Sequence, residues 1–156
     1  IKIIDSNFYR KIDWPIIVML AAMIPIGTAL QTTGVSSLIA TSISAYASDL
    51  SLFWILLIIL IVTMATTDII NNAATAVIMA PISTGIAVEL GYAIEPFLMV
   101  VAVGASCAFL TPIGHQCNTV VMGPGNYKFT DYWRMGLPMD VLIILASIPM
   151  ILFVWT

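Results

Sequence analysis

The stretch 66-TTDIINNAATAV-77 places an acid, two adjacent asparagines and three threonines between two apolar runs. Such groups are costly in hydrocarbon, and irregular backbone at membrane depth occurs only where protein covers it or where it lines a cavity. The 156-residue chain is 61% hydrophobic and 8% charged, with a mean hydropathy of +1.09. A soluble domain of this size cannot bury so much apolar surface. The composition therefore predicts an all-α, polytopic membrane protein.

The basic residues predict how the chain crosses the membrane. All lysines and arginines fall in two clusters, at the N-terminus and over Lys128–Arg134. The positive-inside rule places both clusters in the cytoplasm, so an even number of crossings separates them and the C-terminus lies outside. The apolar run Leu52–Ala65 gives only about 21 Å of helix, against a hydrocarbon core of about 30 Å. It therefore predicts a re-entrant hairpin whose polar tip is the stretch quoted above.

These rules give a predicted order of segments along the chain. They are a cytoplasmic lead-in (1–13), a transmembrane helix (14–33), an interfacial helix (35–47), the re-entrant hairpin (52–90), a discontinuous transmembrane helix (96–123), a cytoplasmic loop (124–137) and a final transmembrane helix (138–156). Residues 35–47 have amphipathic helical spacing, and a buried helix packed against partners is the alternative for them. The chain starts with Ile rather than Met, so we expect it to be a piece of a longer protein.

A second polar break, 111-TPIGHQCNT-119, interrupts the apolar segment that follows the hairpin. Pro112 and Gly114 oppose a continuous helix there. Each break has an Asn followed shortly by a Thr, and a helix is expected to begin after each. The free N–H groups at a helix start suit an anion, whereas carbonyl and Asn oxygens suit a hard cation such as Na⁺. Discontinuous helices of this kind hold substrate and ion in secondary transporters.

Structural roles for the same residues stay open. Asn and Thr also join helices to one another in membranes. Asp68 suits a cation or proton site, a cap of the second helix, or a pair with a partner residue. His115, the single histidine, suits a hydrogen-bonded structural role, a donor to substrate or a pH-sensitive gate. With no nucleophile–base pair, paired carboxylates or CxxC motif, we expect no enzyme, no cofactor and no nucleic-acid partner.

Three stretches carry a resemblance to a known family. They are 12-IDWPIIVMLAAMIPIGTALQTTG-34, 66-TTDIINNAATAVIMAPI-82 and 107-CAFLTPIGHQCNTVVMGPGNYKFTDYWRMGLP-138. The sequence resembles the divalent anion–sodium symporters, which are permeases for dicarboxylates, citrate and sulfate. Its PIGHQ-x-N wording is closest to the subgroup with inserted cytoplasmic regulatory domains. The resemblance implies that the chain is the C-terminal part of the second of two inverted repeats.

The resemblance also implies a set of site residues. Asn71, Asn72 and Ala73 fall on the Ser, Asn and Thr of the family's hairpin signature, and only Asn72 is kept. The implied substrate-binding residues are Asn71, Asn72, Ala73, His115, Asn118 and Thr119. The implied Na⁺ ligands are Asn72, Thr111, Pro112, Gly114 and Asn118. Ala73 lacks the family's carboxylate-binding hydroxyl, while His115 and Gln116 add donors, a change that favours a sulfate-like oxyanion over a dicarboxylate.

The function implied is Na⁺-coupled symport of a divalent anion across the plasma (inner) membrane, with half of the binding site in this chain. The expected partners are the N-terminal half of the same permease, the small divalent anion, membrane lipid and a second copy in a homodimer. An arsenite or Na⁺/H⁺ transporter of the same broad group is one alternative. A membrane module without transport activity is the other, and the presence of an upstream half with a second Asn-Thr break would decide against it.

Overall fold

The computed structural model describes residues 32–47 and 50–155, together with a few isolated positions between 17 and 29. The predicted lead-in and most of the predicted helix 14–33 lie outside the described residues. The described part of the chain consists of helices without strands, which confirms the all-α class there. Its helices are α2 (Val35–Ala47), α3 (Leu52–Thr67), α4 (Asn72–Leu90), α5 (Ile94–Ala105), α6 (Gln116–Met122) and α7 (Phe129–Trp155).

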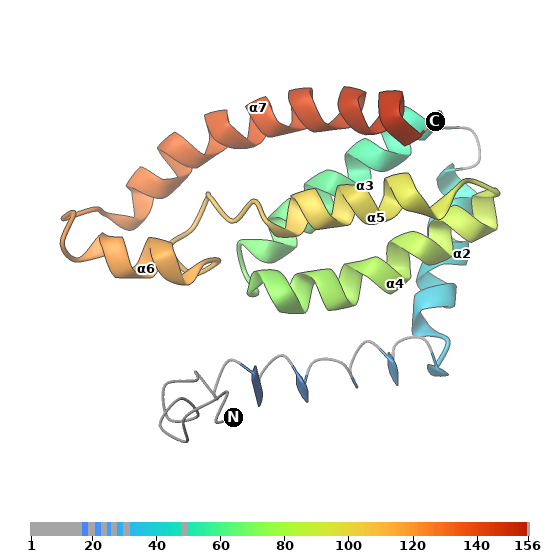
Figure 1. The fold of residues 1–156 in the computed structure, drawn as a ribbon, viewed down its shortest axis with the longest axis horizontal. Helices are drawn as coiled ribbons and strands as arrows, with labels where there is room; N and C mark the ends of the chain where they lie inside the picture. The colour runs from blue at the N-terminus through green and yellow to red at the C-terminus, as the bar shows by residue number, and fades with distance from the viewer. Residues whose placement is uncertain are drawn as a thin grey trace, which may run out of the picture.

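Helices α3, α4 and α5 form the centre of the fold. α3 and α4 run side by side in opposite directions from a short turn, and α5 packs on both (Figure 1). The core is built from large apolar side chains of these three helices, among them Leu56, Leu60, Ile86, Phe97 and Val100. A Cβ at Gly104 of α5 would lie 2.9 Å from Thr63 Cβ, so a glycine is needed where α5 meets α3. The core thus holds in place α3, which ends at the polar tip, and α4, which begins there.

Helices α4 and α7 are the two described helices that are long and apolar enough to cross a membrane. α7 has 27 residues, about 40 Å of helix, and packs on α5 and α3 along one side only. Most of its surface is exposed apolar side chain, such as Phe153 at 87% and Leu145 at 66%. In a membrane protein such a face meets lipid or another part of the protein.

Two predicted boundaries are corrected by the structure. α7 begins at Phe129 rather than 138, inside the predicted loop, because Asp131 Oδ2 accepts the Lys128 N–H at 2.8 Å and caps the first turn. The discontinuous helix stops at Ala105 rather than at Leu110, and apolar residues 107–110 are non-helical. Pattern alone misses both, since the first segment is mixed in polarity and the second is uniformly apolar.

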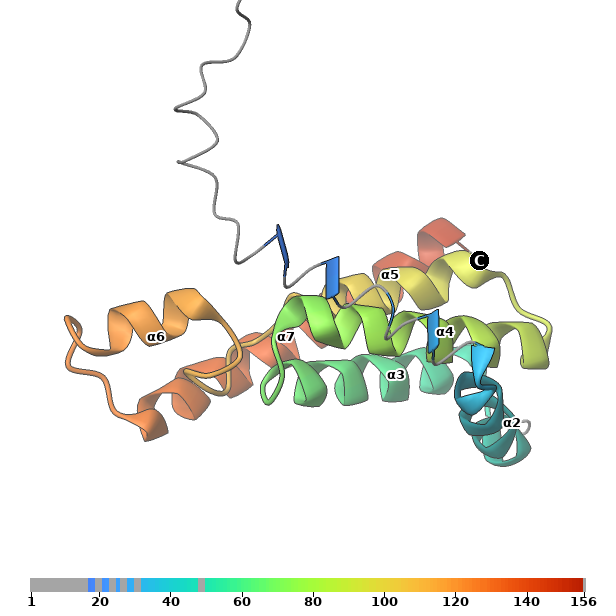
Figure 2. The same cartoon turned by 90° about the horizontal axis from the view of Figure 1, so that it is seen from below.

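Helices α2 and α6 lie at opposite ends of the hairpin. α2 crosses near the end where α3 begins and α4 finishes, whereas α6 lies beyond the tip (Figure 2). α2 packs on α4 and buries Ala40 completely. The depth of α2 in a membrane stays a prediction. α6 buries none of its residues against the described chain.

Candidate functional site

The polar tip ends one helix and starts the next through its own side chains. α3 finishes at Thr67, and the N–H of its cap residue, Asp68, still bonds Met64 O at 3.2 Å. Asn71 is extended, with φ −70° and ψ 157°, and its Oδ1 accepts the Ala74 N–H at 2.8 Å. This is the bond of a helix N-cap. Asn71, predicted as a substrate ligand, therefore has its side-chain oxygen engaged in capping α4.

The second break, predicted over residues 111–119, is non-helical over residues 106–115 in the structure, and short-range hydrogen bonds hold it in shape. Asn118 Nδ2 donates to Ala108 O at 2.8 Å and to Thr111 O at 3.1 Å. Thr119 Oγ1 donates to Pro112 O at 2.6 Å. His115 caps α6, because its Nδ1 accepts the Cys117 N–H at 3.2 Å. Side chains from α6 thus reach back and fix the non-helical backbone that precedes it.

The structure brings the two breaks into direct contact. Asp68 Oδ1 accepts the Leu110 N–H at 3.0 Å, and Thr111 Oγ1 donates to Asp68 O at 2.6 Å. Thr67 Oγ1 lies 3.0 Å from Ala105 O and 2.9 Å from Asn72 Oδ1. A Cβ at Gly114 would lie 2.8 Å from Thr67 O, so only a glycine allows this approach. The unwound backbone of one segment therefore rests against the tip of the other.

The contact region is rich in oxygen and poor in positive charge. Asp68 is 4% exposed, and its Oδ2 has no hydrogen-bond partner among the described residues. The described cations, Lys128 and Arg134, are exposed at the start of α7, and no ion pair is present in the part of the chain that the structure describes. Buried carboxylate and carbonyl oxygens without a cation favour an added positive charge. No group of three or more His, Cys, Asp or Glu side chains suited to a metal ion occurs among these residues.

The predicted site residues differ in how deeply they are buried near the contact between the two breaks. Pro112 and Gly114 are buried, and Asn72, Thr111 and Asn118 are partly buried near the contact. Asn71 and Ala73 are also partly buried, at the start of α4. His115 and Thr119 are exposed, and their side chains bond the Cys117 N–H and Pro112 O rather than the polar tip.

Sequence reasoning missed three contributors to the site. Thr67 joins the tip to the end of α5, and its position beside Asp68 was the available signal. Gly136 of α7 packs closely against the second break. A Cβ added at this glycine would lie 2.5 Å from Phe109 O. Asp140, one turn further along α7, is 8% exposed with an unpartnered Oδ1. Nothing in the local pattern marked Gly136 or Asp140, because α7 reads as one long apolar helix.

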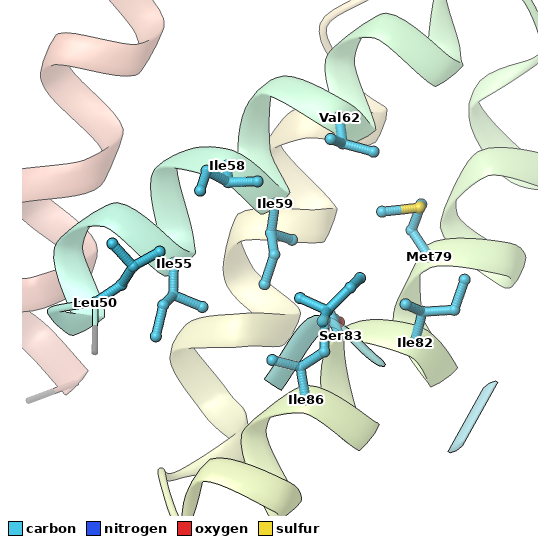
Figure 3. Close-up of a pocket in the computed structure, with 10 residues that line it drawn as sticks. Leu50, Ile55, Ile58, Ile59, Val62, Met79, Ile82, Ser83 and Ile86 are labelled. Atoms are coloured by element: carbon cyan, nitrogen blue, oxygen red, sulfur yellow. The ribbon is translucent and has the colours of Figure 1, made fainter. Parts of the chain in front are cut away.

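A groove between α3 and α4 has a different character. It has a volume of about 70 Å³ and is lined by Ile, Leu, Val and Met side chains plus Ser83 (Figure 3). The Ser83 hydroxyl donates to Ala80 O at 3.1 Å, so it offers no free donor. The groove is an apolar packing feature rather than an ion site.

The proteins to which this chain is similar are named as membrane transporters. The citrate transporter family model matches residues 2–104, which include the hairpin and end before the second break. An uncharacterized transporter of Synechocystis is 38% identical over 150 residues, covering 96% of this chain and 24% of that protein. An uncharacterized transporter of Escherichia coli is 36% identical over 151 residues, with 96% and 25% covered. A sodium/sulfate cotransporter of Chlamydomonas reinhardtii is 27% identical over 139 residues, with 88% and 16% covered.

The similarity to the Synechocystis and Escherichia coli transporters covers 96% of the chain, whereas the family model ends at residue 104. The chain spans only about a quarter of the length of the first two relatives. The names of the family and of these relatives are those of membrane transporters and not of enzymes. The chain belongs to the citrate transporter family.

Proposed function

We propose that this chain is part of a secondary transporter that couples Na⁺ entry to uptake of a divalent oxyanion such as sulfate across the plasma (inner) membrane. The observation that carries the proposal is the contact between two non-helical segments, Asp68 with Leu110 and Thr111. Backbone of this kind at membrane depth lines the ion and substrate sites of secondary transporters. Two Chlamydomonas relatives bear the name sodium/sulfate cotransporter, which supports both the ion and the anion.

The cation would bind to oxygens where the breaks meet. Na⁺ is a hard cation that takes carbonyl, amide and hydroxyl oxygens. Asn72, Thr111, Pro112, Gly114 and Asn118 supply such oxygens from both breaks. Several of the carbonyls already accept one hydrogen bond, as Pro112 O does from Thr119, but each carbonyl keeps a second lone pair. The nearby carboxylate of Asp68 adds a favourable charge.

The anion would meet the start of α4. The first N–H groups of a helix lack internal partners, and the helix dipole places positive charge there. Asn71 takes the N–H of Ala74 with its side chain and that of Thr75 with its carbonyl. The N–H groups of Asn72 and Ala73 therefore remain for a ligand. A further donor would come from His115, whose Nδ1 accepts the Cys117 N–H and whose Nε2–H remains for a ligand. The side-chain protons of Asn118 and Thr119, two other predicted substrate-binding residues, already bond carbonyl oxygens.

The rest of the site would come from outside this chain. Because the chain spans about a quarter of the length of the Synechocystis and Escherichia coli relatives, we propose that the N-terminal half of the same permease supplies the facing half of the site. In this arrangement α3 and α4 form a re-entrant hairpin, and α7 spans the membrane with its C-terminus outside. Membrane lipid surrounds the exposed faces, and the intact permease forms a homodimer.

The two alternative functions assign different roles to the residues of the two breaks. An arsenite or Na⁺/H⁺ transporter would keep the ion site but lack oxyanion selectivity, and a module without transport would use the asparagines as helix joints only. The names of the Chlamydomonas relatives favour sodium and sulfate over these alternatives.

The test is uptake by the intact permease in proteoliposomes. Labelled sulfate and labelled succinate are compared under an inward Na⁺ gradient and under an equal K⁺ gradient. We expect sulfate uptake that requires Na⁺. Equal uptake in K⁺ would refute Na⁺ coupling, and the absence of uptake for both anions in Na⁺ would refute the substrate class.

A further inference from the structure

Asp140 is a buried acid in the middle of α7, a helix that is long and apolar enough to cross a membrane. It lies about three turns from the start of the helix and is the only charged residue from Leu137 to Trp155. Its side chain is 8% exposed, and its Oδ1 has no hydrogen-bond partner among the described residues. An acid at membrane depth is costly, and such acids pair with other groups or mark ion and proton pathways. Packing alone therefore does not account for Asp140.

The fold directs Asp140 toward the contact between the two breaks. Gly136 precedes it by one turn, so the two residues share a face of α7. A Cβ at Gly136 would lie 2.5 Å from Phe109 O and 3.0 Å from the backbone nitrogen of Leu110. The N–H of Leu110 donates to Asp68 Oδ1 at 3.0 Å. The face of α7 that carries Asp140 is therefore packed against the backbone that binds Asp68.

The two buried acids act on each other. Asp140 and Asp68 are close enough for their charges to interact, and both charges also act on the buried thiol of Cys107. Asp68 Oδ2, like Asp140 Oδ1, is buried without a hydrogen-bond partner among the described residues. The described basic side chains, those of Lys128 and Arg134, are exposed and form no ion pair with either acid. Buried carboxylates that repel each other are stable together only when a proton or a metal ion supplies positive charge.

The geometry favours a metal ion over a shared proton. A proton shared by two carboxylates joins them in a hydrogen bond, whereas no hydrogen bond between Asp68 and Asp140 is present in the described part of the chain. A hard cation instead bridges oxygens that do not bond each other. Phe109 O offers a third oxygen, since it lies beside Gly136 of α7 and accepts no hydrogen bond from the described residues. The tip, the second break and α7 each contribute one oxygen without a donor.

We propose that Asp68 Oδ2, Phe109 O and Asp140 Oδ1 bind a Na⁺ ion, at a site that shares no ligand with the cation site proposed above. This inference rests on the proposed function, which supplies Na⁺ as the coupling ion. A coupling ion must leave again in each transport cycle, and the two carboxylates attract a monovalent ion half as strongly as a divalent one. Because α7 contributes a ligand, the bound ion also holds α7 against the contact between the breaks.

The test is the number of Na⁺ ions that the purified intact permease binds at saturation, measured with radiolabelled Na⁺ in the absence of sulfate. Asp140→Asn keeps the shape of the side chain and removes its charge. Glu89→Gln, at an exposed position of α4, is the matched control. We expect Glu89→Gln to bind as many Na⁺ ions per protomer as the unaltered protein, and Asp140→Asn to bind one fewer. The ratio of Na⁺ to sulfate transported, from the reversal potential of proteoliposomes, should fall by the same one ion.

An infrared measurement on the unaltered protein needs no variant. Two of the three ligands are carboxylates, so addition of Na⁺ should shift a carboxylate stretching band in the difference spectrum, and the absence of any shift would overturn the inference. An equal number of Na⁺ ions on Asp140→Asn and on the unaltered protein would also overturn it, because Asp140 would then hold a proton or no ion. Displacement of the Asp140-dependent Na⁺ ion by equimolar Ca²⁺ would overturn the assignment to Na⁺. Failure of the proposed function has a different result, in which Na⁺ is bound but sulfate uptake does not require it.

Discussion

Replacing Gly114 by alanine should separate the two breaks. The added Cβ would lie 2.8 Å from Thr67 O, 2.8 Å from Ala108 Cβ and 3.1 Å from Asp68 Cα. Two of these three atoms are backbone, so the clash is relieved only by moving one break away from the other. Overpacking of this kind costs about 1–3 kcal/mol. If the cation binds across the contact, that cost appears as a rise of about 5- to 150-fold in the Na⁺ concentration for half-maximal uptake.

Gly123→Ala is the matched control for this substitution. It adds the same methyl group at the end of α6, where no atom lies within 4 Å and φ is −67°. The assay is labelled sulfate uptake by the intact permease over a range of Na⁺ concentrations, with the melting temperature of each protein measured in parallel. The reasoning fails if Gly114→Ala and Gly123→Ala give the same Na⁺ dependence and the same melting temperature.

Three further predictions concern the ion, the anion and the topology. Asn72→Ala and Asn118→Ala should each abolish Na⁺-dependent uptake at near-normal abundance, and unchanged Na⁺ dependence in both would reduce these residues to helix joints. Sulfate should be preferred over succinate, because Ala73 lacks the hydroxyl that would bond a carboxylate, and each unmade buried hydrogen bond costs about 1–3 kcal/mol. Competition of unlabelled succinate with labelled sulfate checks this preference. Ala73→Thr should improve succinate binding. In a cysteine-free background, Leu50→Cys and Glu89→Cys should react from the same side of the membrane, and labelling from opposite sides would exclude the hairpin.

The sequence was informative where polarity interrupts a uniform background. The tip at Asp68 and the break at Pro112 both stand out against apolar neighbours, and the structure is non-helical or helix-ending at each. Boundaries inside uniform stretches were harder to predict. Residues 107–110 are apolar and unbroken by proline or glycine, yet the Leu110 N–H bonds the carboxylate of Asp68, 42 residues away in sequence. Such a bond depends on tertiary contact, which no local pattern contains.

The same limit applies to the residues around the contact between the breaks. Asn118 and Thr111, whose ligand roles the family resemblance implies and which stay predictions, lie in an evident break. The structure shows Asn118 bonding Thr111 O and Thr111 bonding Asp68 O. Gly136 lies in a helix and gave no signal, although it makes one of the closest backbone approaches to the second break. The role of a glycine within a helix depends on what packs against it, and this is set by the whole fold.

The hydrogen bonds of the two predicted asparagines separate their roles. Asn118 donates from Nδ2 to two carbonyls, so its Oδ1 is what remains for a ligand, and an oxygen suits a cation. Near Asn72, the Thr67 hydroxyl lies within bonding distance of both Asn72 Oδ1 and Ala105 O, but it has a single proton. When that proton bonds Ala105 O, the Asn72 amide can form a hydrogen bond by turning its NH₂ group toward Thr67 Oγ1. This orientation leaves Asn72 Oδ1 free for a ligand. In the proposed cation site a bound Na⁺ would stabilise this orientation, and Thr67 would then link the end of α5 to the occupancy of that site.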